Sequence, residues 1–168
     1  MLKLIKSSDL ILKQTAEHWD FEKDQNPADL EVDMVQLMVV SHGRGLAANQ
    51  VGLLKRVFAI HLTNQVPFCM FNPVILWGDG NMVTEEEGCL SFPGLILKVP
   101  RHNNITVRYI DRQNKECIIE LTGIDSRCFQ HELDHLDGVC FIDNISPLKL
   151  SLAKKKLLKI FELKIDKI

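Results

Sequence analysis

The chain has 168 residues, of which 46% are hydrophobic and 25% are charged, and this balance excludes long disorder and collagen-like repetition. Its length predicts a single domain over residues 1–168, because two domains would each fall near the lower size limit. The formal net charge of −2 argues against an overall basic, DNA-binding protein.

The first predicted element is a helix over residues 29–41. One apolar stripe runs through Leu30, Met34 and Leu37, and valines at positions 32, 35 and 39 form a second stripe. A helix that is apolar over much of its circumference is expected to be buried. Gly43 should end it, since glycine accepts the left-handed backbone of a helix terminus.

Strands and two further helices follow in chain order. β-Branched and aromatic residues predict strands over residues 57–62 and 67–72, and a hairpin over residues 105–110 and 116–121. Helical spacing returns over residues 124–136, and a short strand then precedes a final helix that opens at Pro147. This order favours an α+β fold with a mostly antiparallel sheet over alternating βαβ units.

Charge and cysteine content bear on location. Residues 147–168 carry seven lysines and two acidic residues, a charge of +5, whereas the preceding part carries 13 basic and 20 acidic residues, a charge of −7. The five cysteines are an odd number, and the sequence shows neither a secretory leader nor an apolar run of membrane-spanning length. We therefore expect a cytoplasmic protein without membrane contact, in which a special cysteine is a metal ligand or a nucleophile.

Residues 131–135, His-Glu-Leu-Asp-His, form a His-Glu-x-x-His motif on the second predicted helix. Histidines four residues apart are about 40° apart around a helix, so both imidazoles can reach one ion. Glu132 is placed to act on a metal-bound water rather than to bind the metal itself. The two histidines share a face with Ile124 and Cys128, and histidines on an apolar face need partners, which argues against a chance match.

A catalytic site with two histidines needs a third protein ligand and one open position. Cys128 is three residues before His131 but lies away from His135, so these three converge poorly on one ion. Cys89 follows a glycine after an acidic run and could approach the pair from outside the helix, although the residues alone favour an idle thiol there. The acidic residues after the motif stand in no recognisable helical pattern: Asp143, Glu162 and Asp166.

Three motifs stand in order along the chain. They are residues 43–50 (Gly-Arg-Gly-Leu-Ala-Ala-Asn-Gln), residues 87–91 (Glu-Gly-Cys-Leu-Ser) and residues 130–135 (Gln-His-Glu-Leu-Asp-His). Together they resemble the motifs of the peptide deformylases, and the similarity runs from about residue 27 to Pro147. Such enzymes remove the N-formyl group from nascent peptides that begin with formyl-methionine, releasing formate. The expected fold is then a mostly antiparallel sheet around a central metal-binding helix, with a C-terminal helix.

The resemblance also implies roles for individual residues. It implies that Cys89, His131 and His135 bind one divalent ion, typically Fe²⁺, with Zn²⁺, Ni²⁺ or Co²⁺ able to occupy the site. Glu132 would carry the proton of the hydrolytic step. The side-chain amide of Gln50 and the backbone N–H of Leu90 would stabilise the oxyanion, which neutral donors can do without holding formate too tightly.

The sequence departs from the family around the pocket for the methionine side chain. Arg44, Glu85 and Arg127 stand where aliphatic residues are usual, and with Gly45 they are the predicted substrate-binding residues. Arg127 is four residues before His131, so its side chain can reach the mouth of the site. The three charges either rim the pocket and alter the preference for the first residue, or they point to solvent.

Other interpretations remain beside the deformylase one. A zincin-type metallopeptidase would need a glutamate or histidine as third ligand, and a deformylase-like binding protein would not need Glu132. Glu87 and Arg101 are expected to pair behind Cys89, which matters only if both are buried. The basic C-terminal helix either packs with a solvated lysine face or, as the resemblance implies, docks on ribosomal RNA.

Overall fold

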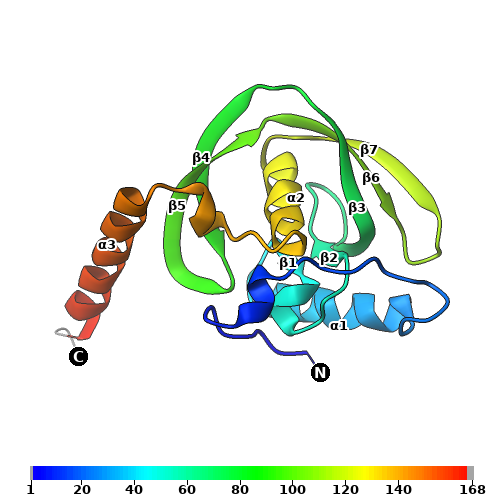
Figure 1. Ribbon diagram of the computed structural model, residues 1–168, viewed down its shortest axis with the longest axis horizontal. Helices are drawn as coiled ribbons and strands as arrows, with labels where there is room; N and C mark the ends of the chain where they lie inside the picture. The colour runs from blue at the N-terminus through cyan, green and yellow to red at the C-terminus, as the bar shows by residue number, and fades with distance from the viewer. Residues whose placement is uncertain (1, 166–168) are drawn as a thin grey trace.

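The computed structural model describes residues 2–165, and the side chains of residues 2–160. The fold is α+β, as predicted, and its named strands pair in antiparallel fashion. The larger sheet has the strand order β1 (Gly45–Ala47), β2 (Val57–Ile60), β3 (Phe68–Gly78), β6 (Asn104–Ile110) and β7 (Glu116–Thr122). Helix α2 (Gly123–Leu136), which carries the His-Glu-x-x-His motif, lies at the centre, as Figure 1 shows.

Strand β2 is buried on both faces because a helix covers each side of the larger sheet. Phe58 and Ile60 point toward α2, and the ring of Phe58 meets that of Phe129 edge to face at 5.3 Å. Val57 and Ala59 alternate with them and pack with the residues of helix α1 (Pro27–Val40). Because successive side chains of a strand point to opposite faces, those of β2 belong alternately to two separate hydrophobic clusters.

Helix α1 confirms the predicted element but not its complete burial. Leu30, Met34 and Met38 are buried against the sheet, and Val35 packs partly buried beside them, whereas Val32 is 60% and Val39 50% exposed. A single face of the helix meets the sheet, so the prediction of burial is wrong for Val32 and Val39. The helix also ends at Val40, before Gly43, and His42 takes the left-handed backbone there with φ of 57°.

Strand β3 is longer than the predicted strand over residues 67–72. The predicted end is a bulge, since Asn72 has a φ of 48° and the register against β6 shifts between Phe71 and Val74. Asn-Pro is typical of a strand end, but here the strand continues beyond it to Gly78. The predicted hairpin is confirmed as β6 and β7.

A second sheet, which was not predicted from the sequence, joins β4 (Met82–Cys89) to β5 (Phe92–His102). Leu95, Leu97 and Val99 alternate along β5 and are buried with Phe141. The alternation is present in the sequence, but prolines and glycines interrupt it, and Pro100 is tolerated because a two-stranded sheet has open edges. This sheet lies beside α2 on the side away from β7 (Figure 1).

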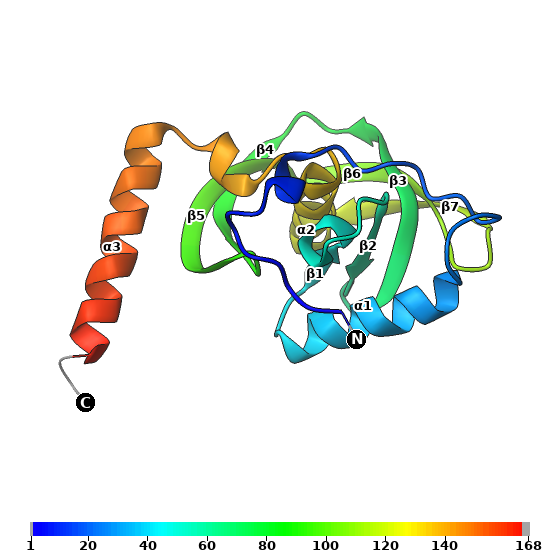
Figure 2. The same ribbon diagram turned by 60° about the horizontal axis from the view of Figure 1, so that its bottom comes forward.

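The segment after α2 contains a 3₁₀ helix, Phe141–Asn144, where a short strand was predicted. The side chain of Asp143 accepts the backbone N–H of Cys140 at 2.8 Å, which bends the chain and prevents an extended run. Helix α3 (Pro147–Ile165) follows and stands out from the body beside β5, as Figure 2 shows. Within residues 2–165, no helix combines the length and hydrophobicity needed to span a bilayer.

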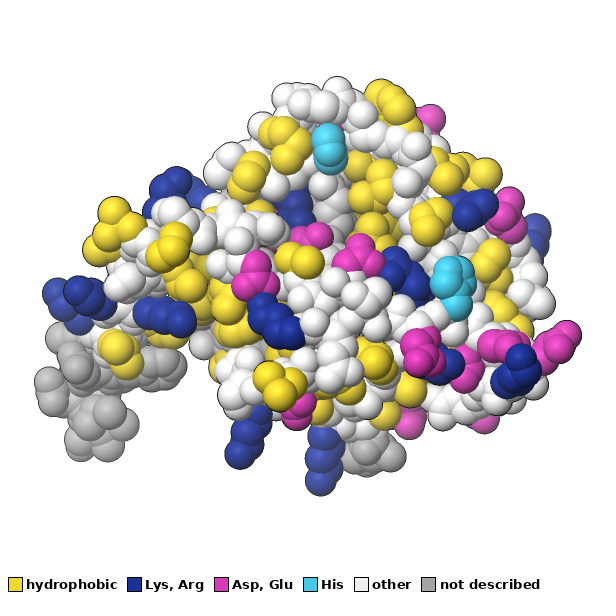
Figure 3. Space-filling view, viewed as in Figure 1, with side chains coloured by type: hydrophobic (Ala, Val, Ile, Leu, Met, Phe, Trp, Pro, Cys, Tyr) yellow, Lys and Arg dark blue, Asp and Glu magenta, His cyan; other side chains and the backbone are white. Residues whose placement is uncertain are grey.

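Helix α3 meets the body through Leu150, Ala153 and Leu157, which pack beside Phe141. Apolar residues at the same helical spacing follow at Phe161 and Ile165, and their side chains lie outside the described part. The described lysines of the helix are exposed, and Figure 3 shows dark blue side chains on this helix at the left of the molecule. The predicted C-terminal helix that opens at Pro147 is thus confirmed.

Candidate active site

Three side chains with metal-binding atoms meet where the end of β4 reaches α2. The candidate ligand atoms of Cys89, His131 and His135 all lie within 4.8 Å of one another. Cys89 Sγ lies 3.2 Å from His135 Nε2, and the two imidazole rings are 5.1 Å apart. A register shift in the β4–β5 pair between Glu87 and Cys89 helps to aim the thiol, because a bulge changes the direction of a side chain.

A carboxylate orients the ring of His131, whereas Nδ1 of His135 has no hydrogen-bond partner among the described residues. His131 Nδ1 lies 2.9 Å from Glu87 Oε2, so this nitrogen donates to the carboxylate and Nε2 is free to face the thiol. Asn49 donates a side-chain hydrogen bond to the carbonyl of His135. Burial lowers the pKa of His135 well below its usual range, which keeps that ring neutral and able to act as a ligand.

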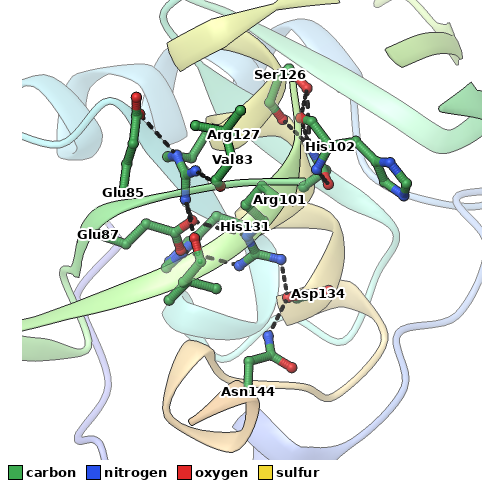
Figure 4. A network of polar contacts seen from close by, with 12 residues as sticks. Val83, Glu85, Glu87, Arg101, His102, Ser126, Arg127, His131, Asp134 and Asn144 are labelled. Atoms are coloured by element: carbon green, nitrogen blue, oxygen red, sulfur yellow. Dashed lines mark hydrogen bonds and ion pairs between the residues drawn. The ribbon is translucent and has the colours of Figure 1, made fainter. Parts of the chain in front are cut away.

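The predicted pairing of Glu87 with Arg101 is confirmed, and both side chains are buried. Arg101 donates from Nε and Nη2 to the two carboxylate oxygens of Glu87, at 2.9 and 3.1 Å. Burial alone would raise the pKa of Glu87, but hydrogen bonds from His131 and Arg101 lower it to about 2. Glu87 therefore stays ionised and accepts from the metal-site histidine, as Figure 4 shows.

Gln50 reaches the same centre from the 3₁₀ helix Ala48–Val51. Its Oε1 accepts the backbone N–H of Ala47 at 2.8 Å, which fixes the orientation of the amide. Its Nε2 is then directed at Cys89 Sγ, 3.4 Å away, and at Ser91 Oγ, 3.0 Å away. A neutral N–H donor is thus held next to the thiol.

Glu132 is buried beside the three candidate ligands. Among the described residues its Oε2 has no hydrogen-bond partner, and burial raises its pKa to about 7. A Cβ added to Gly45 would lie 2.2 Å from Glu132 Oε1, so the glycine is required by close approach rather than by a turn. Gly43 likewise lies against Leu90, where an added Cβ would be 2.7 Å from Cδ1. A buried carboxyl with a free oxygen next to metal-binding atoms can carry a proton.

Comparison with known proteins agrees with this geometry. The family model of polypeptide deformylases matches residues 1–151. The chain is 41% identical to the peptide deformylase of Thermodesulfovibrio yellowstonii over 160 residues, which cover 93% of this chain and 96% of that protein.

The chain belongs to the peptide deformylase family.

Solved structures of deformylases have the same fold. That of Thermotoga maritima is 38% identical, with a TM-score of 0.82, and the match covers 88% of this chain and 99% of the other. A Synechococcus elongatus deformylase in complex with actinonin is 36% identical, with a TM-score of 0.84, over 92% of this chain and 85% of the other. The chain is therefore an enzyme, a metal-dependent hydrolase that removes the N-formyl group from formyl-methionyl nascent peptides and releases formate. The zincin and binding-protein interpretations are not favoured.

The deformylase site opens into a pocket of about 420 Å³. Gly45, Gln50, Cys89, Leu90, His131 and Glu132 all line it, so the structure brings together the metal-ligand, acid–base and oxyanion candidates of the sequence. Cys128 also lines the pocket but is not part of the Cys89–His131–His135 group. Asp143 pairs instead with Lys13, and the side chain of Glu162, like Asp166, lies outside the described part.

The three charged residues predicted near the pocket have different surroundings. Arg44 lines the pocket and pairs with Asp125. Glu85 is exposed, does not line the pocket, and lies 3.4 Å from Arg127. Arg127 lines the pocket but is only 4% exposed, so the alternative that it points to solvent is wrong for this residue. Its guanidinium is occupied by Glu87 and by strand carbonyls.

The donor set of this deformylase suits a divalent metal. One thiol and two imidazoles converge, Glu87 orients one of the imidazoles, and a buried carboxyl lies beside them without being one of the three. Such a set is typical of catalytic ions that keep an open position. Sequence reasoning missed the contacts of Ser91 with Gln50 and of Arg127 with Glu87. The spacing of Arg127 from His131 was the visible signal, but it indicated the mouth of the site rather than Glu87.

Proposed function

We propose that this deformylase holds one divalent ion through Cys89, His131 and His135 and hydrolyses the formamide bond with Glu132 as the acid–base group. The observation that carries the proposal is the convergence of the three ligand atoms within 4.8 Å beside a buried carboxyl with an unpaired oxygen. Fe²⁺ is the proposed ion, with Zn²⁺, Ni²⁺ or Co²⁺ as substitutes, since thiolate and imidazole suit all of them. When bound, such an ion supplies Lewis acidity toward water and the formyl oxygen.

Glu132 moves the proton in this mechanism. It accepts a proton from the attacking water and delivers it to the departing amine, so that water and the formyl peptide become formate and a free N-terminus. Burial keeps the carboxyl apart from bulk water, and its unpaired Oε2 is available to the reacting groups. Gly45 leaves the space that this carboxyl occupies.

Gln50 and Leu90 are the proposed oxyanion donors. The side-chain N–H of Gln50 is fixed toward Cys89 by the contact of its Oε1 with Ala47. Leu90 follows Cys89 directly, lines the pocket, and offers its backbone N–H. Pre-oriented neutral donors stabilise the charge that develops on the formyl oxygen without reorganising during the reaction.

The substrate-binding part is proposed to be the wall formed with Gly45, Arg44 and Arg127, with Glu85 outside it. The side chain of Arg44 is more open to a ligand than that of Arg127, because it is 37% exposed, whereas Arg127 is buried among acceptors. We expect the first side chain of the peptide to enter next to this arginine. A charged wall would weaken the preference for methionine over polar or acidic first residues.

The ribosome is a proposed partner through α3, in a cytoplasmic location. The lysines of α3 at positions 154, 155, 156 and 159 are exposed. Leu150, Ala153 and Leu157 of the same helix pack against the body. Phosphate contacts by lysine need no base specificity and weaken steeply with salt. Co-sedimentation with ribosomes should fall when the four lysines become glutamine. Equal or salt-independent binding by the two proteins would contradict this partner.

The test of the function is formate release from formyl-Met-Ala-Ser by protein purified anaerobically with Fe²⁺ or Ni²⁺. We expect stoichiometric formate and free amine, and loss of the activity when a chelator removes the ion. Absence of formate release from a protein with one ion per chain would contradict the proposed site.

A further inference from the structure

Arg127 is a buried cation on the metal-binding helix, one turn before His131. Its side chain is 5% exposed, although the pocket runs beside it. A guanidinium excluded from water in this way requires partners for its N–H groups. The contacts of Arg127 therefore indicate what the residue does.

Those contacts all lie on the β4–β5 sheet. Nη1 of Arg127 donates to Glu87 Oε1 and to the carbonyl of Val99, each at 2.7 Å. Nη2 donates to the carbonyl of Val83 at 2.6 Å, and Nε lies 3.4 Å from the carboxylate of Glu85. One planar side chain thus contacts both strands and a buried carboxylate, a geometry that the flexible ammonium of lysine cannot reproduce.

Glu87 is where these contacts reach the metal site. Its Oε1 accepts from Arg127 and Arg101, and its Oε2 accepts from Arg101 and His131, as Figure 4 shows. With Arg101 alone the carboxylate would still be paired, but its Oε1 would lose one of two donors. The position of Oε2, and with it the orientation of the His131 ring, depends on where both arginines hold the carboxylate.

The ligands themselves come from two separate elements. Cys89 ends β4, whereas His131 and His135 project from α2. Arg127 belongs to the helix and its contacts belong to the sheet, so the residue fixes the distance between the thiol and the imidazoles. Arg101 makes the reciprocal connection, from β5 to Asp134 on α2.

We propose that Arg127 is a positioning residue that acts through Glu87 to hold His131 and Cys89 in register for metal binding. This role rests on the proposed metal site of Cys89, His131 and His135. Arg127 can therefore line the pocket wall without donating hydrogen bonds to the peptide, because a guanidinium that already contacts a carboxylate and two carbonyls would have to leave them to do so.

The test measures the affinity of the purified protein for Co²⁺, whose visible absorption reports thiolate and imidazole ligands. Arg127→Met should bind Co²⁺ about 10–100-fold more weakly, the usual effect of removing a group that orients a ligand. Arg127→Lys should also bind more weakly, because charge alone does not replace the planar contacts. Arg56→Met is the matched control, since Arg56 pairs with Asp137 at the end of α2 and touches none of the site, and it should bind Co²⁺ as the wild type does.

A double-variant cycle shows whether Arg127 acts through Glu87. The double variant Glu87→Gln/Arg127→Met should bind Co²⁺ no more weakly than Glu87→Gln alone. The carboxylate that connects Arg127 to His131 is already absent in Glu87→Gln. Fully additive losses would overturn the proposal, as would wild-type affinity in Arg127→Lys and Arg127→Met with a raised KM for formyl-Met-Ala-Ser. If Arg127→Met does not fold, Arg127→Lys decides between these outcomes. A wild-type protein without the thiolate signature would instead contradict the metal site on which the proposal rests.

Discussion

Two arginine–carboxylate contacts border the same pocket but lie in different surroundings. Behind the metal site, Arg101 and Glu87 have side chains that are 7% and 4% exposed and meet through two hydrogen bonds. At the mouth, Arg44 and Asp125 are 37% and 17% exposed. The buried pair fixes the orientation of His131, whereas the open pair is screened by water and leaves Arg44 able to respond to a ligand. We therefore expect the same residue types to support the chemistry in one region and to tune selectivity in the other.

The largest expected effect comes from removing a ligand in the buried region. Cys89→Ala, His131→Ala and His135→Ala should each bind close to no metal and show no measurable formate release, because two donors and an open position do not hold the ion. Metal content of the purified variants provides the measurement. Retention of one ion per chain in Cys89→Ala would contradict the ligand assignment.

Removal of an oxyanion donor should have the next largest effect on activity. Gln50→Ala should lower turnover by about 10²–10³-fold, the usual result of removing one such donor. The metal content should remain that of the wild type, which separates this variant from the ligand variants. Steady-state kinetics on formyl-Met-Ala-Ser would contradict the role if KM changed and kcat did not.

The free energy of unfolding should depend more on the buried Arg101–Glu87 pair than on the open Arg44–Asp125 pair. Arg101→Met should lower the free energy of unfolding by about 3–5 kcal/mol, because it removes two of the four hydrogen bonds to the buried Glu87 carboxylate and the ion pair with Asp134. Asp125→Asn should lower it by about 0.2–1 kcal/mol, the usual contribution of a partly exposed pair. Urea unfolding of both variants under the same metal loading gives the comparison. Equal losses would mean that burial does not distinguish the pairs.

The smallest effect is expected at the mouth. Arg44→Ile should raise the preference for methionine over an acidic first residue by about two- to five-fold, since a screened charge contributes at most about 1 kcal/mol. A panel of formyl-Xaa peptides measures it as ratios of kcat/KM. An unchanged ratio would show that Arg44 faces solvent and does not reach the first side chain.

Regular elements with an unbroken period were predictable from the sequence, and interrupted ones were not. The spacing of α2 and the hairpin of β6 and β7 were confirmed nearly to the residue. The β4–β5 sheet was missed because Pro93, Gly94 and Pro100 conceal its alternation, and β3 was shortened because Asn72 forms a bulge rather than an end. Hydrophobic periodicity therefore predicted secondary structure correctly where the local preference of the residues agrees with their packing in the fold.

The candidate site was recognisable because three short motifs resemble those of a known family, and not because of a regular hydrophobic pattern. Its motifs name residue types, but their functions depend on distances between segments that lie far apart in the chain. The sequence predicted Gly45 as a substrate-binding residue but did not show that its lack of a Cβ makes room for Glu132. It also placed Arg127 at the mouth, because helix geometry gives a direction but does not show that Glu87 and two carbonyls occupy the guanidinium.

The most direct test of the account is a paired measurement on wild type and Glu132→Ala. Both proteins are loaded anaerobically with Fe²⁺ or Ni²⁺, and metal per chain and the rate of formate release from formyl-Met-Ala-Ser are measured together. The account predicts one ion per chain in both, with a rate at least about 10²–10⁴-fold lower in Glu132→Ala, because the ligands remain and the proton carrier is gone. A fully loaded Glu132→Ala that releases formate at the wild-type rate would contradict it.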